Sequence, residues 1–171
     1  MYPVDERDKV TELEKVPQSS VGAPLPIVLS DEHKLLLGYI VQDSPSDWES
    51  SYVRVVDPST SGEPLALVEF SFYSSFMFGA PNDEVFEGHP LASRGLHPYG
   101  AFQIEDSSWV RQLERMNSVH RYHQPERFAR LKHFVFAFHD STFECVAESF
   151  TVSEHEGSME SLLSEMQSRL Q

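Results

Sequence analysis

Histidine is the residue type in this chain with the clearest chemical use, because imidazole is the commonest metal ligand and also transfers protons near neutral pH. Six of the eight histidines lie between residues 89 and 139: His89, His97, His120, His123, His133 and His139. A metal site needs several ligands that converge in space, and our candidates for such ligands are His89, His97 and His139. For chemistry without a metal, the candidate catalytic residues are His139, Asp140 and Glu144.

Residues 133–152 (HFVFAFHDSTFECVAESFTV) are predicted to form a β-hairpin that positions part of this set. With the turn at Asp140-Ser141, the alternation of side chains gives one apolar face, made of Phe134, Phe136, Phe138, Phe143, Cys145 and Ala147. The opposite face carries His133, His139, Glu144 and Glu148. In this register His133 lies opposite Glu148, which predicts a surface ion pair, and His139 is a diagonal neighbour of Glu144.

His89 and His97 lie in residues 79–100, a segment without helical or strand periodicity that contains four of the eight glycines and three prolines. Loops longer than about 12–15 residues without structure of their own are uncommon in compact domains and are often functional. The segment is therefore a candidate site. The alternative is a connection that wraps the sheet.

Signatures of known catalytic sites are missing. The sequence has no His-Glu-x-x-His, no Gly-x-Ser-x-Gly, no phosphate-binding P-loop and no Gly-x-Gly-x-x-Gly. The run His139 to Thr142 contains the residue types of a catalytic triad, but neighbouring residues in a turn point in different directions, so we interpret it as turn chemistry. The one cysteine, Cys145, lies on the apolar face of the hairpin and is predicted to be buried.

The formal net charge of −14 argues against general binding to nucleic acid or to an anionic membrane, since both require a positive surface. Residues 107–133 nevertheless contain six Lys or Arg against two Glu, a local charge of +4 that leaves −18 on the remainder. This stretch is either a solvated face paired with acidic neighbours or a site for an anionic ligand or partner. The candidate ligand-binding residues are Arg94, His97, Tyr99, Arg121 and Arg127.

The pattern of apolar residues predicts an α+β fold: a curved, mostly antiparallel sheet of about six or seven strands with a mid-chain helix and a C-terminal amphipathic helix. Strands are expected near residues 26–29, 34–42, 52–56, 65–78 (one strand or two) and 101–104, followed by the hairpin. Helices are expected from residue 109, from Pro125 and over 158–170. Residues 1–24 are expected to be a mobile tail with a short helix near 5–15, and residues 25–171 a single domain.

The leading hypothesis is a cytoplasmic domain that binds a protein partner or a small anion without chemistry of its own, and a homodimer through the basic stretch is one form of it. The second is a histidine-based hydrolase or lyase, with or without a metal, that uses the 79–100 loop and the 133–150 hairpin. A third is a structural subunit that associates through Tyr73, Phe76 and Phe78. No cofactor, substrate or partner is identified by the sequence.

Overall fold

The structure is a computed structural model of the chain and describes residues 2–43 and 55–171. In these residues, nine strands form two antiparallel sheets. The five-stranded sheet has the order β1-β6-β7-β8-β5: β1 (Lys9–Glu12), β6 (Ala101–Glu105), β7 (Lys132–Ala137), β8 (Thr142–Ala147) and β5 (Ser75–Gly79). The four-stranded sheet has the order β2-β3-β4-β9: β2 (Ile27–Ser30), β3 (Leu35–Ile40), β4 (Glu63–Ser71) and β9 (Ser149–Gly157).

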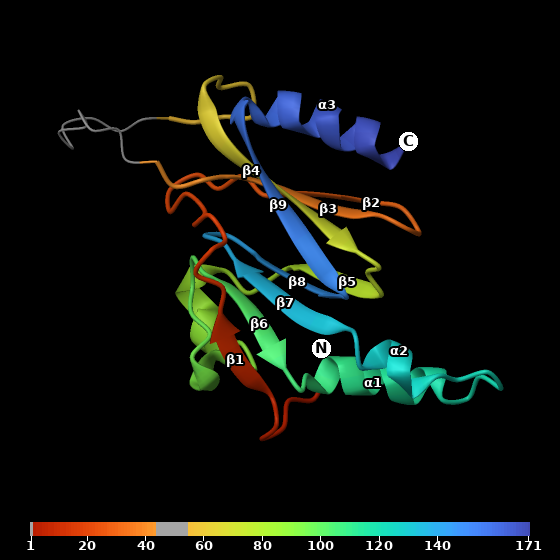
Figure 1. Cartoon of the computed structure of the whole chain (residues 1–171). Coiled ribbons are helices and arrows are strands. Elements are labelled where there is room, and N and C mark those ends of the chain that lie inside the picture. The colour runs from red at the N-terminus through yellow and green to blue at the C-terminus, as the bar shows by residue number, and fades with distance from the viewer. Residues whose placement is uncertain (1, 44–54) are drawn as a thin grey trace.

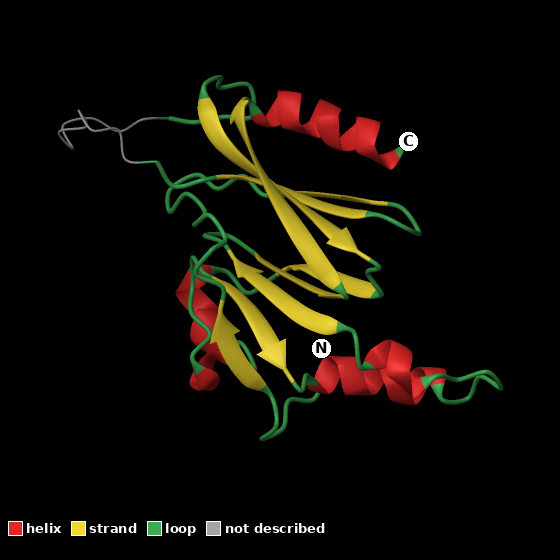
Figure 2. Ribbon diagram, in the orientation of Figure 1, coloured by secondary structure: helices red, strands yellow, loops and turns green. Residues whose placement is uncertain are grey.

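The molecule has four layers, as Figure 1 shows, because each sheet packs its inner face on the other sheet and its outer face on helices. The helix α3 (Met159–Leu170) covers the outer face of the four-stranded sheet. The helix α1 (Ser108–Asn117), the short α2 (Pro125–Phe128) and two 3-10 helices, η1 (Asp83–Gly88) and η2 (Ala92–Arg94), lie on the side of the five-stranded sheet (Figure 2). The predicted α+β class is confirmed, with two sheets in place of one curved sheet.

Several phenylalanines fill the space between the sheets. Phe134, Phe136, Phe143 and Cys145 pack there against Phe70 and other residues of the four-stranded sheet. The alternate residues of the same hairpin, such as Val135 and Val146, face the helices on the outer side. The predicted division of the hairpin into two faces, with a buried Cys145, is therefore confirmed.

The predicted register of the hairpin is wrong by two residues. Phe136 lies opposite Phe143, not Cys145, because the turn falls at His139-Asp140, one residue earlier than predicted: the Phe138 N–H donates to the Ser141 carbonyl. A slip of two residues keeps every side chain on its face and changes only its partner, so the apolar pattern could not detect it. The second strand also ends early, and the chain crosses at Glu148 from β8 to β9 in the other sheet.

The N-terminal segment is paired and packed, which differs from the expected tail. Residues 9–12 form β1 on the edge of the five-stranded sheet, where a helix over 5–15 was predicted. Tyr2 and Asp8 are buried. The register of β1 is set by its backbone pairing with β6. The sequence of β1 (KVTE) contains a single apolar residue, so the strand has no alternating pattern of apolar residues.

Other expected elements are found with adjusted bounds. Residues 63–79 form two strands separated by a turn at Phe72, which has a positive φ of 52°. The predicted strand over residues 52–56 falls mostly outside the described residues. Ser107 caps α1, because its side chain accepts hydrogen bonds from the N–H groups of Trp109 and Val110. Among the described residues, no helix has the length and apolar character needed to cross a membrane.

Candidate functional site

The most unusual group of polar side chains surrounds Glu144, a carboxylate that is only 5% exposed. Glu144 lies on β8 and faces the helix-covered side of the five-stranded sheet. Its Oε2 atom accepts hydrogen bonds from the Tyr2 hydroxyl (2.5 Å) and from His133 Nε2 (2.9 Å). Its Oε1 atom lies 3.4 Å from His89 Nε2. One carboxylate thus joins the N-terminal segment, β7 and the 79–100 loop.

The other contacts of the two histidines determine where their protons lie. The Leu91 N–H donates to His89 Nδ1 (3.1 Å), so the proton of a neutral His89 is on Nε2 and points to Glu144. The Ser107 Oγ atom accepts backbone N–H groups of α1, and its own proton is therefore free to donate to His133 Nδ1 (3.0 Å). His133 then also carries its proton on Nε2, toward Glu144. The second hydrogen bond of each ring fixes its tautomer.

Burial and hydrogen bonding oppose each other at this site. Burial raises the pKa of Glu144, but the hydrogen bonds from His133, His89 and Tyr2 outweigh it and lower this pKa to about 2. Burial lowers the pKa of His133 below its ordinary value, against the opposite effect of Glu144. Burial and the adjacent carboxylate both raise the pKa of the Tyr2 hydroxyl. At neutral pH the site is a buried anion, and its donors His133 and Tyr2 are neutral.

The hydrogen bonds run from Ser107 through His133 to Glu144, which is the order of residue types in the relay of a serine hydrolase. Two observations argue against a nucleophilic role for Ser107. The residue is 4% exposed, and its oxygen accepts two backbone N–H groups as the cap of α1. We therefore interpret the relay as a support that attaches α1 to the sheet. Glu144, one of the three predicted catalytic candidates, belongs to this buried network and does not pair with His139.

A second cluster forms where the 79–100 loop meets the hairpin. His139 Nδ1 lies 3.0 Å from Asp83 Oδ2 and 2.9 Å from the Tyr99 hydroxyl, which also donates to Asp83. The hydrogen bond from Tyr99 lowers the pKa of Asp83, and in turn raises the pKa of Tyr99 to about 12. The His139 side chain is 40% exposed, and its Nε2 atom lies 3.9 Å from the exposed Asp140. This geometry resembles that of a general base whose tautomer a carboxylate fixes.

The three candidate metal ligands have three different sets of partners. His89 contacts Glu144, His139 contacts Asp83, and His97 lies 3.6 Å from Glu12 and packs on the ring of Phe102. Within residues 2–43 and 55–171, no group of three His, Cys, Asp or Glu side chains could hold a metal ion. The structure thus does not bring these three histidines together.

The candidate residues for binding an anionic ligand also lie in different parts of the structure. Arg94 donates to the Asp8 carbonyl (3.0 Å) and attaches the N-terminal segment, while Tyr99 belongs to the His139 cluster and His97 lies near Glu12. Arg127 lies on α2, and the Arg121 guanidinium lies 4.2 Å above the ring of Tyr122. Only these two arginines share one feature of the structure, the projection formed by residues 116–127.

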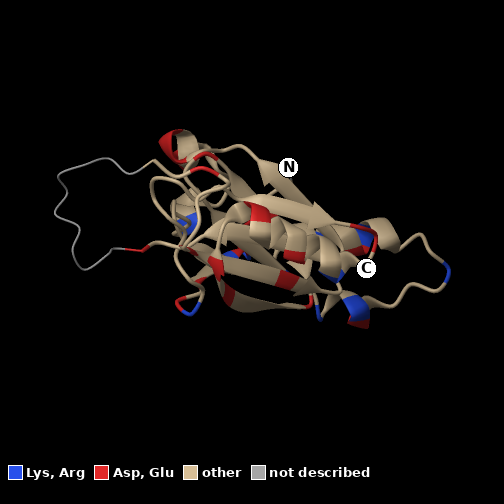
Figure 3. Cartoon of the chain, turned by 90° about the horizontal axis from the view of Figure 1, so that it is seen from above, with Lys and Arg blue, Asp and Glu red and all other residues tan. Residues whose placement is uncertain are grey.

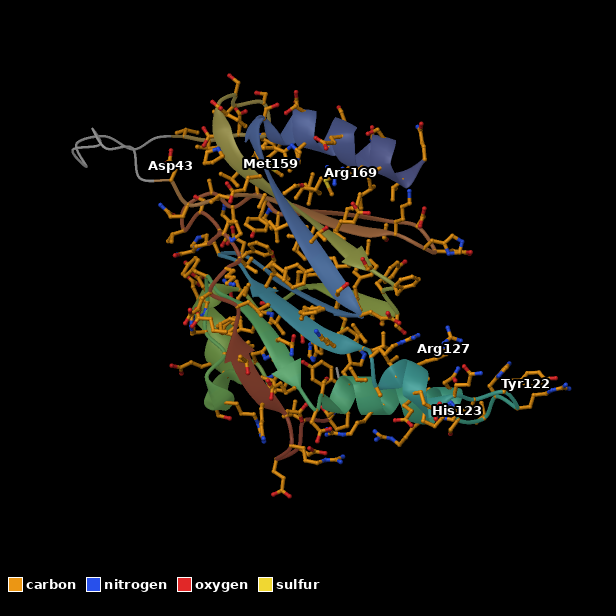
Figure 4. All side chains as sticks on the ribbon, in the orientation of Figure 1. Asp43, Tyr122, His123, Arg127, Met159 and Arg169 are labelled. Carbon is orange, nitrogen blue, oxygen red and sulfur yellow. The ribbon has the colours of Figure 1, made fainter. Side chains whose placement is uncertain are left out.

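Residues 116–127, here called the arm, comprise the end of α1, the following loop and the start of α2. Figure 4 shows Tyr122 at the end of the arm, away from the sheets. Three apolar or aromatic side chains of the arm are largely exposed: Met116 (64%), Val119 (91%) and Tyr122 (64%). A pocket of about 640 Å³ lies at its base, between α1, α2 and β6. Figure 3 shows basic positions on the arm and acidic ones spread over the remaining chain.

The sequence interpretation missed three residues of these clusters. Tyr2 was assigned to the tail, and Asp83 is one of several acidic residues in an aperiodic loop. Ser107 precedes the helix that was predicted from residue 109, and no sequence pattern relates it to His133. The predicted surface ion pair of His133 with Glu148 is wrong, since His133 is buried on Glu144 and Glu148 pairs with Arg130 (3.1 Å). The register error explains this.

In comparisons with known proteins, no family model, no curated protein and no solved structure matches this chain.

Proposed function

We propose that this protein is a non-catalytic binding domain that docks a carboxylate-bearing surface of a partner protein through the arm. The observation that carries the proposal is the exposure of Met116, Val119 and Tyr122 beside Arg121 and Arg127 on one projecting segment. Met, Tyr and Arg are enriched in protein interfaces, and clustered exposed apolar side chains are typical of binding surfaces.

The charges near the arm support an acidic partner. Arg111 is engaged by Asp5 (2.7 Å) and Asp106 (2.8 Å), and Arg130 by Glu148, so these cations stabilise the fold itself. Arg121, by contrast, lies over an exposed ring at the tip, where a partner carboxylate can approach both. The net charge of −14 opposes an acidic partner at long range. This repulsion is screened over about 8 Å at physiological salt, and the arm holds its tip away from the acidic body.

Site-specific photo-crosslinking tests the proposal. A benzoylphenylalanine at position 122 should capture a defined partner in cells, whereas the same group at Phe72, which is 76% exposed in the turn after β4, should not. The captured protein is then purified, and its affinity is measured. Changing both Arg121 and Arg127 to Glu should weaken binding at least about tenfold, because interfacial charges are reversed. The matched control is Arg7→Glu at the exposed N-terminal segment. Identical capture from both positions, or unchanged affinity of the double variant, refutes the proposal.

The geometry of His139 favours a second candidate function, acid–base catalysis of a hydrolase or lyase. Asp83 fixes Nδ1, and the half-exposed ring offers Nε2 to solvent. Hydrolysis of p-nitrophenyl acetate by the wild type is compared with His139→Gln and Asp83→Asn. Catalysis through this pair predicts a loss of about 100-fold in both variants. A rate equal to that of His33→Gln, a change in an exposed turn, rejects it.

A further inference from the structure

Tyr2 is held by the domain in the way that a pocket holds a ligand. Its ring stacks on Trp109, with centroids 5.3 Å apart and planes within 8°, and it meets the edge of His133 at 5.1 Å. Its hydroxyl donates to the Glu144 carboxylate. The residue is 5% exposed, whereas Pro3 and the following residues 5–7 are exposed. The aromatic side chain is thus inserted from a segment in which several neighbouring residues lie at the surface.

The walls of this pocket are fixed by contacts that do not involve Tyr2. Trp109 packs against His133 at 5.1 Å, and its backbone N–H is bonded to Ser107. Glu144 keeps two imidazole donors, and both imidazoles are themselves held at their second nitrogen. The pocket is therefore organised in advance for an aromatic ring with a hydroxyl group. Preorganised pockets of this kind retain affinity for small ligands when their native occupant is removed.

The N-terminal segment is also attached at points other than Tyr2. The Asp8 carboxylate accepts the Ser108 N–H (2.6 Å), Arg94 donates to the Asp8 carbonyl, and Arg111 pairs with Asp5 (2.7 Å). Val4 and Val10 are partly buried, and β1 contributes four residues at the edge of its sheet. Edge strands open at lower free energy than the core of a sheet. Tyr2 can consequently leave its pocket while the two sheets remain packed.

We propose that the pocket formed by Trp109, His133 and Glu144 is an exchangeable binding site for a phenol, and that Tyr2 occupies it in the absence of another phenol. Recognition follows from the chemistry of the walls. The ionised Glu144 requires a hydrogen-bond donor and rejects an anion, while Trp109 requires a flat ring. This site is independent of the arm, so either proposal can fail without the other.

The test uses the full chain with Tyr2→Ala and p-cresol, which is the tyrosine side chain without its backbone. The side-chain N–H resonance of Trp109 should shift saturably with p-cresol. Toluene should bind at least about tenfold more weakly, because it leaves a buried carboxylate without its donor. The anion 4-methylbenzoate should not bind. Tyr2→Phe is the matched control: its ring fills the pocket, so the variant should bind p-cresol far more weakly than Tyr2→Ala.

A Tyr2→Ala chain that does not fold by itself gives the same information. Folding should then be restored by p-cresol and not by toluene, as measured by circular dichroism. The proposal is overturned if p-cresol neither binds the folded variant nor restores the unfolded one. It is equally overturned if toluene matches p-cresol, since the site would then be a plain apolar cavity.

The phenol can come from a small molecule or from Tyr2 of a second copy, whose β1 strand would be exchanged. Sedimentation of the wild type distinguishes the two sources. A small-molecule site is indicated if the wild type is a monomer and binds p-cresol at least about tenfold more weakly than Tyr2→Ala does, because the tethered Tyr2 then competes with p-cresol. A dimer that p-cresol dissociates, and that Tyr2→Ala does not form, indicates exchange between copies. A monomer in which p-cresol binds with equal affinity to both proteins contradicts occupancy by Tyr2.

Discussion

Replacing Tyr2 with Phe isolates one atom of the Glu144 site, because the ring remains against Trp109 and only the hydroxyl is lost. This hydroxyl is one of three donors to a buried, ionised carboxylate. Hydrogen bonds to charged groups contribute roughly 1.5–3 kcal/mol, so we expect the free energy of unfolding at pH 7 to fall by this amount. Urea denaturation, followed by both fluorescence and circular dichroism, measures it.

Tyr39→Phe is the matched control for this substitution. The Tyr39 hydroxyl is also buried, but it donates to a neutral acceptor, the Pro17 carbonyl (2.7 Å), and its loss should cost roughly 0.5–1.5 kcal/mol. In a Glu144→Gln background the cost of Tyr2→Phe should fall to that of the neutral bond. A cost for Tyr2→Phe below about 0.5 kcal/mol, the range of ordinary surface changes, would refute the reasoning.

Three further predictions concern pH, packing and capping. The pKa values of His133 and Glu144 are lower in the folded state than their ordinary values of 6.5 and 4.5, so each group contributes stability above its ordinary pKa that is lost on acidification. The free energy of unfolding should therefore fall below pH 6.5, with a further loss of about 3 kcal/mol between pH 4.5 and 2 from Glu144; a constant urea midpoint from pH 7 to 4 would contradict this. Gly38→Ala should lower the free energy of unfolding by about 1–3 kcal/mol, because the new Cβ lies 2.8 Å from a methyl group of α3. Gly88→Ala has open space around its new Cβ and should change this free energy by less than about 0.5 kcal/mol. Equal changes of the melting temperature in the two variants would contradict this packing argument. Ser107→Ala should cost about 1–2 kcal/mol or more in urea denaturation, since it removes the cap of α1 and the donor to His133, and a neutral effect would contradict both roles.

The parts of the fold that the sequence predicts are those with a strong apolar repeat. The alternation of Phe134, Phe136, Phe143 and Cys145 gives the face between the sheets, and the spacing of Met159, Leu162 and Met166 gives the buried side of α3. Alternation does not specify which residue lies opposite which, because a slip of two residues is invisible to it. The predicted partners of His133 and Glu144 were wrong for this reason.

The Glu144 site depends on contacts across long stretches of chain. Glu144 comes from the predicted hairpin, and its expected place diagonal to His139 made it a candidate. Tyr2 lies 142 positions away and His89 lies 55 positions away, in segments without periodicity. No local pattern relates such residues, since their proximity follows from how the N-terminal segment and the 79–100 loop pack on the sheet. The grouping of the histidines in the sequence suggested His89, His97 and His139 as ligands of one metal, and the described residues form no such group.

The structure predicts that Glu144 is an ionised carboxylate held by Tyr2, His133 and His89. Carbon-13 NMR of the glutamate side-chain carboxyl groups tests it most directly, with Glu144→Gln to assign the resonance. We predict that the Glu144 signal keeps the chemical shift of an ionised carboxylate at every pH where the protein is folded, in agreement with a pKa lowered to about 2. A titration of this signal with a midpoint at or above the ordinary value of 4.5 would contradict the claim.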